Sequence, residues 1–195
     1  MSNPHLHFGR LGNNLFQWAY IYAQCRKGEI PDIFLQSPEY FEGYEEEIKD
    51  LFGRGDGSEP YIAIHLRVGE NPINPSEPRY EKNPFYKNLA ETDYYEKAIV
   101  LFPNERFLIF SDDLEFAKSY FIGKEYEFDE TKDPIEALTR MSNCKSVIIA
   151  NSSFSWWGGF LCCPQGSYKI VAPSSDKWYT DGKERTVCPK SWVRV

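Results

Sequence analysis

Apolar strands and amphipathic helices alternate along the chain from about residue 60 to its end. The clearest strand, 61–66, is a near-continuous run of β-branched and aromatic residues, which is typical of a strand covered on both faces. The predicted strands cover 61–66, 106–110, 124–128, 145–150 and 168–173, and the predicted helices cover 92–102, 111–121, 133–144 and 151–161. Such alternation predicts an α/β fold, with a Rossmann-like parallel sheet and helices on both of its faces.

Residues 1–57 have a different pattern. A Gly-rich turn followed by an amphipathic helix is predicted over 9–28, with Gly28 at the position of a C-cap. The segment 29–58 is acidic and rich in turn residues, and its GRGDG tract at 53–57 predicts a linker or loop. We therefore expect a small N-terminal lobe over 1–57 and a sheet-containing lobe over 58–195.

The charge of the chain bears on its partners. The formal net charge is −7, and no stretch is a basic block. Nucleic acid and anionic membrane surfaces repel such a chain, so neither is an expected partner. An anionic small ligand would need a local cluster of hydrogen-bond donors instead.

Targeting, cysteine and metal signals are all weak. The polar N-terminus does not resemble a signal peptide, and no run approaches the roughly 18 apolar residues of a transmembrane helix. The three histidines show no zinc-site spacing. The cysteines are odd in number and lack CxxC spacing, which predicts free thiols: Cys25, Cys144, Cys162, Cys163 and Cys188. We expect a cytoplasmic protein without a transmembrane segment or a metal site.

Three polar patches follow predicted strands, at 65–70 (HLRVGE), 111–113 (SDD) and 151–155 (NSSFS). The carboxyl ends of parallel strands share one edge of a sheet, where ligands bind in open α/β folds. Arg67 offers a planar fork of donors for a phosphate, and a helix that starts after Asn151 offers free N–H groups. A carboxylate of SDD can accept hydrogen bonds from a base or a ribose. Together these groups predict a nucleoside diphosphate pocket.

Each patch also has a plainer interpretation. Ser111 and Asp112 are equally suited to capping a helix, as are the residues of 151–153. Trp156 and Trp157 suit a hydrophobic core, and Arg67 suits a surface ion pair. These interpretations stay open for each residue singly, but their coincidence at one edge favours a site.

Four motifs carry a resemblance to a known family: GRLGNNLFQWA, IHLRVGE, FSDD and ANSSFSWWGGFL. In this order they resemble the family 11 glycosyltransferases of the α-1,2-fucosyltransferase type, within the wider superfamily that includes protein O-fucosyltransferases. The resemblance runs from residue 8 to the end of the chain. It implies a GT-B-like fold and inverting transfer of fucose from GDP-fucose to a hydroxyl of a glycan acceptor. It also implies that no metal or other cofactor is required.

The resemblance also assigns roles to residues. Arg67 corresponds to the arginine that neutralises the leaving β-phosphate, His65 precedes it in the motif, and Asn13 faces the phosphates or the reacting sugar. Glu70 is the nearest candidate for a general base. The residues expected to bind the donor are Gly12, Asn13, Arg67, Asp112, Asp113, Asn151, Ser152, Ser153, Phe154 and Ser155.

Two departures from the family pattern keep other functions open. Val68 stands where the family usually has a second arginine, and only about fifty residues separate Asn13 from His65. The acceptor-side lobe over 1–57 is therefore expected to be strongly reduced by an internal deletion, and a homodimer could restore an acceptor surface. The alternative is a catalytically impaired descendant that acts as a nucleotide- or glycan-binding module. A third hypothesis is a flavodoxin-like or other small α/β binding protein.

Overall fold

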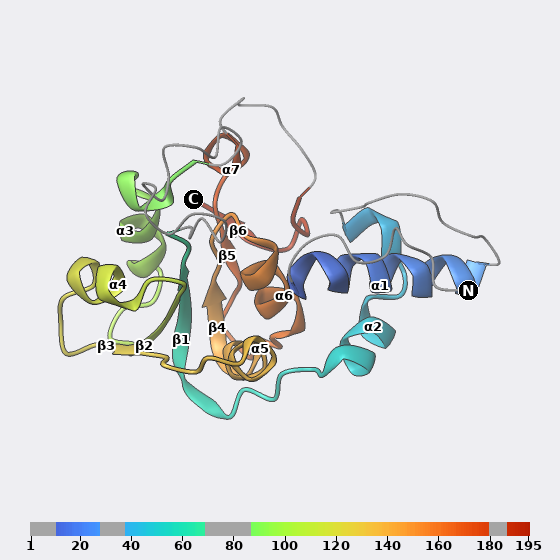
Figure 1. Ribbon diagram of the computed structural model, residues 1–195, viewed down its shortest axis with the longest axis horizontal. Helices are drawn as coiled ribbons and strands as arrows, with labels where there is room; N and C mark the ends of the chain where they lie inside the picture. Colours follow the sequence, from blue (N-terminus) through green and yellow to red (C-terminus); the bar gives the residue numbers. More distant parts are fainter. Residues whose placement is uncertain (1–10, 28–37, 69–86, 180–186) are drawn as a thin grey trace.

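Six parallel strands form a single sheet, in the order β3-β2-β1-β4-β5-β6, in the computed structural model of the protein (Figure 1). The structure describes residues 11–27, 38–68, 87–179 and 187–195. The strands are β1 (Glu59–Leu66), β2 (Phe107–Ser111), β3 (Tyr126–Phe128), β4 (Cys144–Ile148), β5 (Val171–Ala172) and β6 (Val193–Arg194). This is the order of a doubly wound Rossmann sheet, so the predicted α/β class and parallel sheet are confirmed.

The strand order reverses between β1 and β4. Ile64 of β1 is in register with Ile109 of β2 on one side and with Ile148 of β4 on the other. The chain leaves β1 toward β2 and returns later to β4, so the connections diverge at this point. In open α/β sheets, the crevice beyond the carboxyl ends of two such strands is where ligands bind.

Helices cover both faces of the sheet (Figure 1). One face packs against α3 (Tyr94–Ile99) and α4 (Leu114–Tyr120), in a core that includes Ile62 and Ile64. The other face packs against α5 (Pro134–Ser142) and α6 (Ser153–Leu161), in a core that includes Ala63. Two further short helices belong to this part of the chain: η2 (Leu89–Glu91) precedes α3, and α7 (Ser175–Trp178) follows β5.

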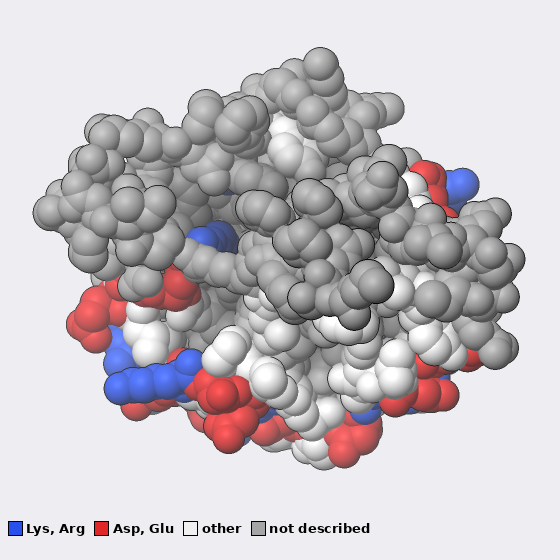
Figure 2. Space-filling view, turned by 45° about the vertical axis from the view of Figure 1, so that its right-hand side comes forward, with Lys and Arg blue, Asp and Glu red and all other residues white. Residues whose placement is uncertain are grey.

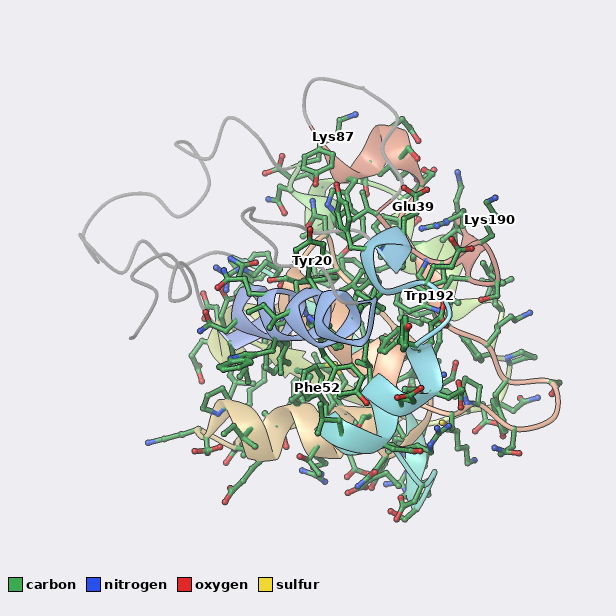
Figure 3. The ribbon with its side chains drawn as sticks, turned by 90° about the vertical axis from the view of Figure 1, so that its right-hand side faces the viewer. Tyr20, Glu39, Phe52, Lys87, Lys190 and Trp192 are labelled. Carbon is green, nitrogen blue, oxygen red and sulfur yellow. The ribbon has the colours of Figure 1, made fainter. Side chains whose placement is uncertain are left out.

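The N-terminal elements extend the second core. They are α1 (Leu11–Lys27), η1 (Pro38–Phe41) and α2 (Glu45–Phe52). Phe16, Phe41 and Ile48 belong to the same cluster of buried residues as the tryptophans of α6. Phe52, at the end of α2, lies between α1 and α5 in Figure 3 and meets the ring of Trp157 at 5.4 Å. The predicted lobe boundary at residue 57 stays a prediction; the described residues on its two sides share one core.

Gly55, in the middle of the GRGDG tract, packs tightly against the end of this core. The Gly55 N–H donates to the Leu161 carbonyl at 2.9 Å. A Cβ at Gly55 would overlap the Ser142 carbonyl oxygen, so only glycine fits between the ends of α5 and α6. The tract is thus a loop, as predicted, and only Gly55 within it is buried, because two helix ends lie against that residue.

Candidate functional site

Arg67 and Asp112 meet at the carboxyl ends of β1 and β2. The Arg67 Nη1 lies 2.5 Å from the Asp112 Oδ2, and the Asp112 Oδ1 accepts the Val68 N–H at 2.8 Å. Their side chains are 27% and 15% exposed. One carboxylate thus holds a guanidinium and a main-chain N–H, which fixes the two strand ends relative to each other. The structure brings these two predicted residues together, and their contact with a ligand stays a prediction.

Asp113 and Ser111 form a helix cap beside this pair. The Asp113 Oδ1 accepts the Phe116 N–H at 3.2 Å as the N-cap of α4. The Ser111 hydroxyl accepts the Asp113 N–H at 3.0 Å. A helix cap is thus present, but Asp113 forms it rather than Asp112, to which the plainer interpretation assigned it, and Asp112 bonds to the strand end of β1 instead.

The start of α6 forms the second half of the candidate site. Ser152 is the N-cap in an extended conformation and makes no side-chain cap bond, and the first turn of α6 contains no acidic residue. The first N–H groups of a helix have no acceptor within the helix, and they form the positive end of its dipole. Ser152, Ser153 and Phe154 are only partly buried. This end of α6 is therefore suited to an anion.

Two residues of the predicted donor site lie behind this turn. Ser155 is fully buried, and its hydroxyl accepts the Ala150 N–H at 3.1 Å. Asn151 is 7% exposed, and its side-chain amide donates to the main-chain carbonyls of Lys87 and Trp178. Both side chains thus bond to the main chain in the structure.

The first turn of α1 packs directly on the first turn of α6. A Cβ built at Gly12 would lie 2.5 Å from the Ser153 carbonyl carbon and 2.7 Å from the Phe154 nitrogen. Gly12 and Asn13 lie inside α1, which begins at Leu11, so the expectation of a Gly-rich turn at these two residues is wrong. The close approach of two backbones explains the glycine, and it brings two helix N-termini together.

We expect Gly12→Ala to lower the free energy of unfolding by about 1–3 kcal/mol, although alanine favours a helix by about 1 kcal/mol. The new methyl group meets main-chain atoms, which cannot rotate away. Gly158→Ala is the matched control, because its Cβ meets the flexible Met141 side chain. Chemical denaturation measures both variants, and a Gly12→Ala protein as stable as the wild type would contradict the close packing of α1 on α6.

His65 connects the two halves of the candidate site. Its ring centroid lies 5.6 Å from that of Phe154, and its Nδ1 has no hydrogen-bond partner among the described residues. Burial lowers the pKa of His65 to about 4; the Asp112 carboxylate opposes this shift, and the Arg67 charge adds to it. The imidazole is therefore neutral at pH 7.

Two tyrosines that the sequence analysis did not single out hold the strand ends from the opposite face. The Tyr95 hydroxyl donates to the His65 carbonyl at 2.8 Å, and the Tyr94 hydroxyl donates to the Ile149 carbonyl at 2.6 Å. Both side chains are buried on α3. The sequence could indicate only that these tyrosines lie on the apolar face of a helix. Their hydrogen bonds could not be predicted, because the acceptors are main-chain carbonyls of distant strand ends.

Other predictions about the site have mixed outcomes. Glu70 lies outside the described residues. No group of His, Cys, Asp and Glu among the described residues is arranged to hold a metal ion, and no described helix is long and apolar enough to cross a membrane. The described cysteines Cys144, Cys162, Cys163 and Cys188 are free thiols, as predicted. Figure 2 shows acidic and basic side chains of the described residues next to one another along the lower edge of the view.

Comparison with known families shows which family the chain belongs to. A model of Glycosyl transferase family 11 matches residues 39–195, which include the sheet, Arg67, Asp112 and the start of α6. The chain belongs to glycosyl transferase family 11. The matched range begins after α1, so Gly12 and Asn13 lie outside it.

Three relatives are similar in sequence to this family 11 chain. Alpha-1,2-colitosyltransferase of Escherichia coli is 30% identical over 87% of this chain and 63% of its own length. The O-antigen biosynthesis glycosyltransferase WbnK of Escherichia coli is 30% identical over 68% of this chain and 44% of its own length. The Caenorhabditis elegans protein svh-11, provisionally named a galactoside 2-alpha-L-fucosyltransferase, is 28% identical over 66% of this chain and 41% of its own length. The chain thus spans about half the length of these curated relatives, and no solved structure matches it.

Proposed function

We propose that this family 11 chain transfers fucose from GDP-fucose to a hydroxyl of a glycan acceptor, with inversion at the sugar carbon. The observation that carries the proposal is the contact of His65 with Phe154. Through this contact, the Arg67 end of β1 and the start of α6 flank the point where the strand order reverses. A guanidinium and a helix N-terminus on the two sides of this point are suited to a diphosphate.

The proposed chemistry is charge separation across the bond between sugar and diphosphate. As the bond breaks, negative charge grows on the diphosphate, and donors aimed at it lower the barrier. Arg67 supplies the positive charge, and the first N–H groups of α6 supply hydrogen bonds without net charge. In this proposal these donors, rather than a metal ion, stabilise the negative charge of the leaving diphosphate.

The remaining groups of the site complete this proposal. Asp112 orients Arg67 through their ion pair and through its bond to the Val68 N–H. Neutral His65 offers a hydrogen bond to an uncharged group of the donor. In this proposal Asn13, in the first turn of α1, binds the phosphates or the reacting sugar, and Glu70 takes the proton of the acceptor hydroxyl.

The acceptor side of the proposal rests on the relatives. The names of two of these relatives specify transfer to position 2, and one of them specifies a galactoside. We therefore propose an α-1,2 linkage to a galactoside-containing glycan. In the same proposal the sheet binds the donor in a GT-B-type arrangement, and residues 1–57 contribute to the acceptor side.

Isothermal titration with GDP and GDP-fucose tests the donor, with UDP as the control nucleotide. We expect GDP and GDP-fucose to bind and UDP to bind much more weakly. Incubation with GDP-fucose and lactose, followed by mass spectrometry, then tests the transfer. Failure of GDP to bind at millimolar concentration would overturn the proposed function.

A second function is favoured by one observation. Val68 is 7% exposed and packs in the core on the α3 and α4 side, at the position where the family pattern has a second arginine. A chain with one arginine at this site fits a nucleotide-binding descendant that lacks transfer. Binding of GDP-fucose without transfer to any of a panel of galactosides would favour this second function.

A further inference from the structure

The side chain of Asn151 joins three segments that are far apart in the sequence. Its Nδ2 donates to the Lys87 carbonyl at 2.7 Å and to the Trp178 carbonyl at 3.1 Å. Lys87 lies just before η2, and Trp178 is the last residue of α7. Asn151 itself lies in the turn between β4 and α6 and is only 7% exposed.

These two bonds use the whole donor capacity of the amide. A primary amide nitrogen carries two N–H groups, and each of them here has a main-chain carbonyl as its acceptor. Removing the amide would leave buried carbonyl groups without this donor, which is costly. The Asn151 amide nitrogen therefore has no N–H left for a ligand phosphate.

The same turn carries the N–H groups that open α6. Ser152 and Ser153 follow Asn151 directly, and the Ser155 hydroxyl holds the Ala150 N–H on the other side. Buried side chains thus fix the turn at two consecutive residues, Ala150 and Asn151, directly before the start of α6. The direction of the first N–H groups of α6 depends on where these two anchors hold the backbone.

We propose that Asn151 is a positioning residue, which holds the β4–α6 turn so that the first N–H groups of α6 point at a bound diphosphate. Asn151 acts on the ligand through the backbone and does not touch it. This inference rests on the proposed function, because it needs a nucleoside diphosphate at the start of α6.

A second bridge between the same segments supplies a matched control. The Lys177 Nζ of α7 lies 2.6 Å from the Asp93 Oδ1, at the start of α3. This ion pair ties α7 to the η2–α3 segment, as Asn151 does, but it does not involve the β4–α6 turn. Lys177→Ala therefore loosens the same segments and leaves the turn anchored.

The test compares Asn151→Asp with Lys177→Ala by isothermal titration with GDP and by thermal unfolding. The Asn151→Asp change would keep the shape of the side chain but would place carboxylate oxygens against two carbonyls. We expect Asn151→Asp to raise the Kd for GDP by about tenfold or more. Lys177→Ala should lower the Tm and leave this Kd unchanged. Asn151→Ala takes the place of Asn151→Asp if the latter does not fold.

The possible contrary results are distinct. An unchanged Kd in the Asn151 variants, or an equal rise in Lys177→Ala, would overturn the positioning role. Failure of the wild-type protein to bind GDP would contradict the proposed function instead. Hydrogen exchange at the first turn of α6 then decides whether Asn151 holds the turn: faster exchange in Asn151→Asp than in Lys177→Ala supports this anchoring, and equal exchange overturns it.

Discussion

Arg67→Ala is expected to lower the rate of sugar transfer by about 10²–10³-fold and to weaken the binding of GDP. In the proposed reaction the guanidinium of Arg67 is the positive charge that faces the leaving diphosphate. Its removal also leaves the Asp112 carboxylate without this partner, and that negative charge then repels the diphosphate. Steady-state kinetics with GDP-fucose and titration with GDP measure the two effects.

Two control variants test whether the effect is specific to the guanidinium of Arg67. Arg67→Lys keeps the charge but loses the planar fork, so we expect an intermediate loss. Arg106→Ala removes an arginine that is 58% exposed, pairs with Glu127 and lies over the ring of Tyr61, outside the candidate site. It should leave GDP binding unchanged. An Arg67→Ala protein that binds GDP as tightly as Arg106→Ala would refute the assigned role.

Trp156→Ala is expected to lower the free energy of unfolding by about 3–5 kcal/mol. Trp156 is fully buried on α6, and its ring meets those of Phe16 at 4.5 Å, Phe160 at 5.1 Å and Trp192 at 5.5 Å. It therefore joins α1, α6 and the C-terminal segment, and the resulting cavity would loosen all three. This loss is a large part of a typical stability of about 5–15 kcal/mol.

The neighbouring tryptophan provides a matched comparison. The Trp156 Nε1 donates to the Val187 carbonyl at 2.6 Å, whereas the Trp157 Nε1 has no partner among the described residues. Trp156→Phe should therefore cost about 1 kcal/mol more than Trp157→Phe in urea denaturation, because only the first change removes a hydrogen bond. Equal costs would contradict the different environments of the two indoles.

The sequence predicted the central part of the fold well, because apolar runs and helix caps are local signals. Strands β1 to β5 and the starts of α4 and α5 lie within a few residues of their predicted positions, whereas the short strand β6 was not predicted. The helix predicted over 92–102 is shorter: α3 begins at Tyr94, after Thr92 has ended η2, and it ends at Ile99. The helix α2 was missed: it has three acidic residues in its first turn, and Ile48 is its only fully buried residue.

The candidate site could be predicted only where one edge of the sheet determines it. Arg67 and Asp112 follow neighbouring strands, so parallel topology alone brings them together. The role of Gly12 as a point of backbone contact with α6 depends on a helix that lies far later in the chain. Asn151 likewise bonds to main-chain groups that have no sequence signature. Contacts of this kind become visible only in three dimensions.

A crystal structure of the protein with bound GDP tests most directly whether the ends of β1 and β4 share one diphosphate. We predict that the diphosphate lies between the Arg67 guanidinium and the Ser153 N–H, within hydrogen-bonding distance of both. A diphosphate bound elsewhere, with Arg67 and the start of α6 both out of contact with it, would contradict the proposed site.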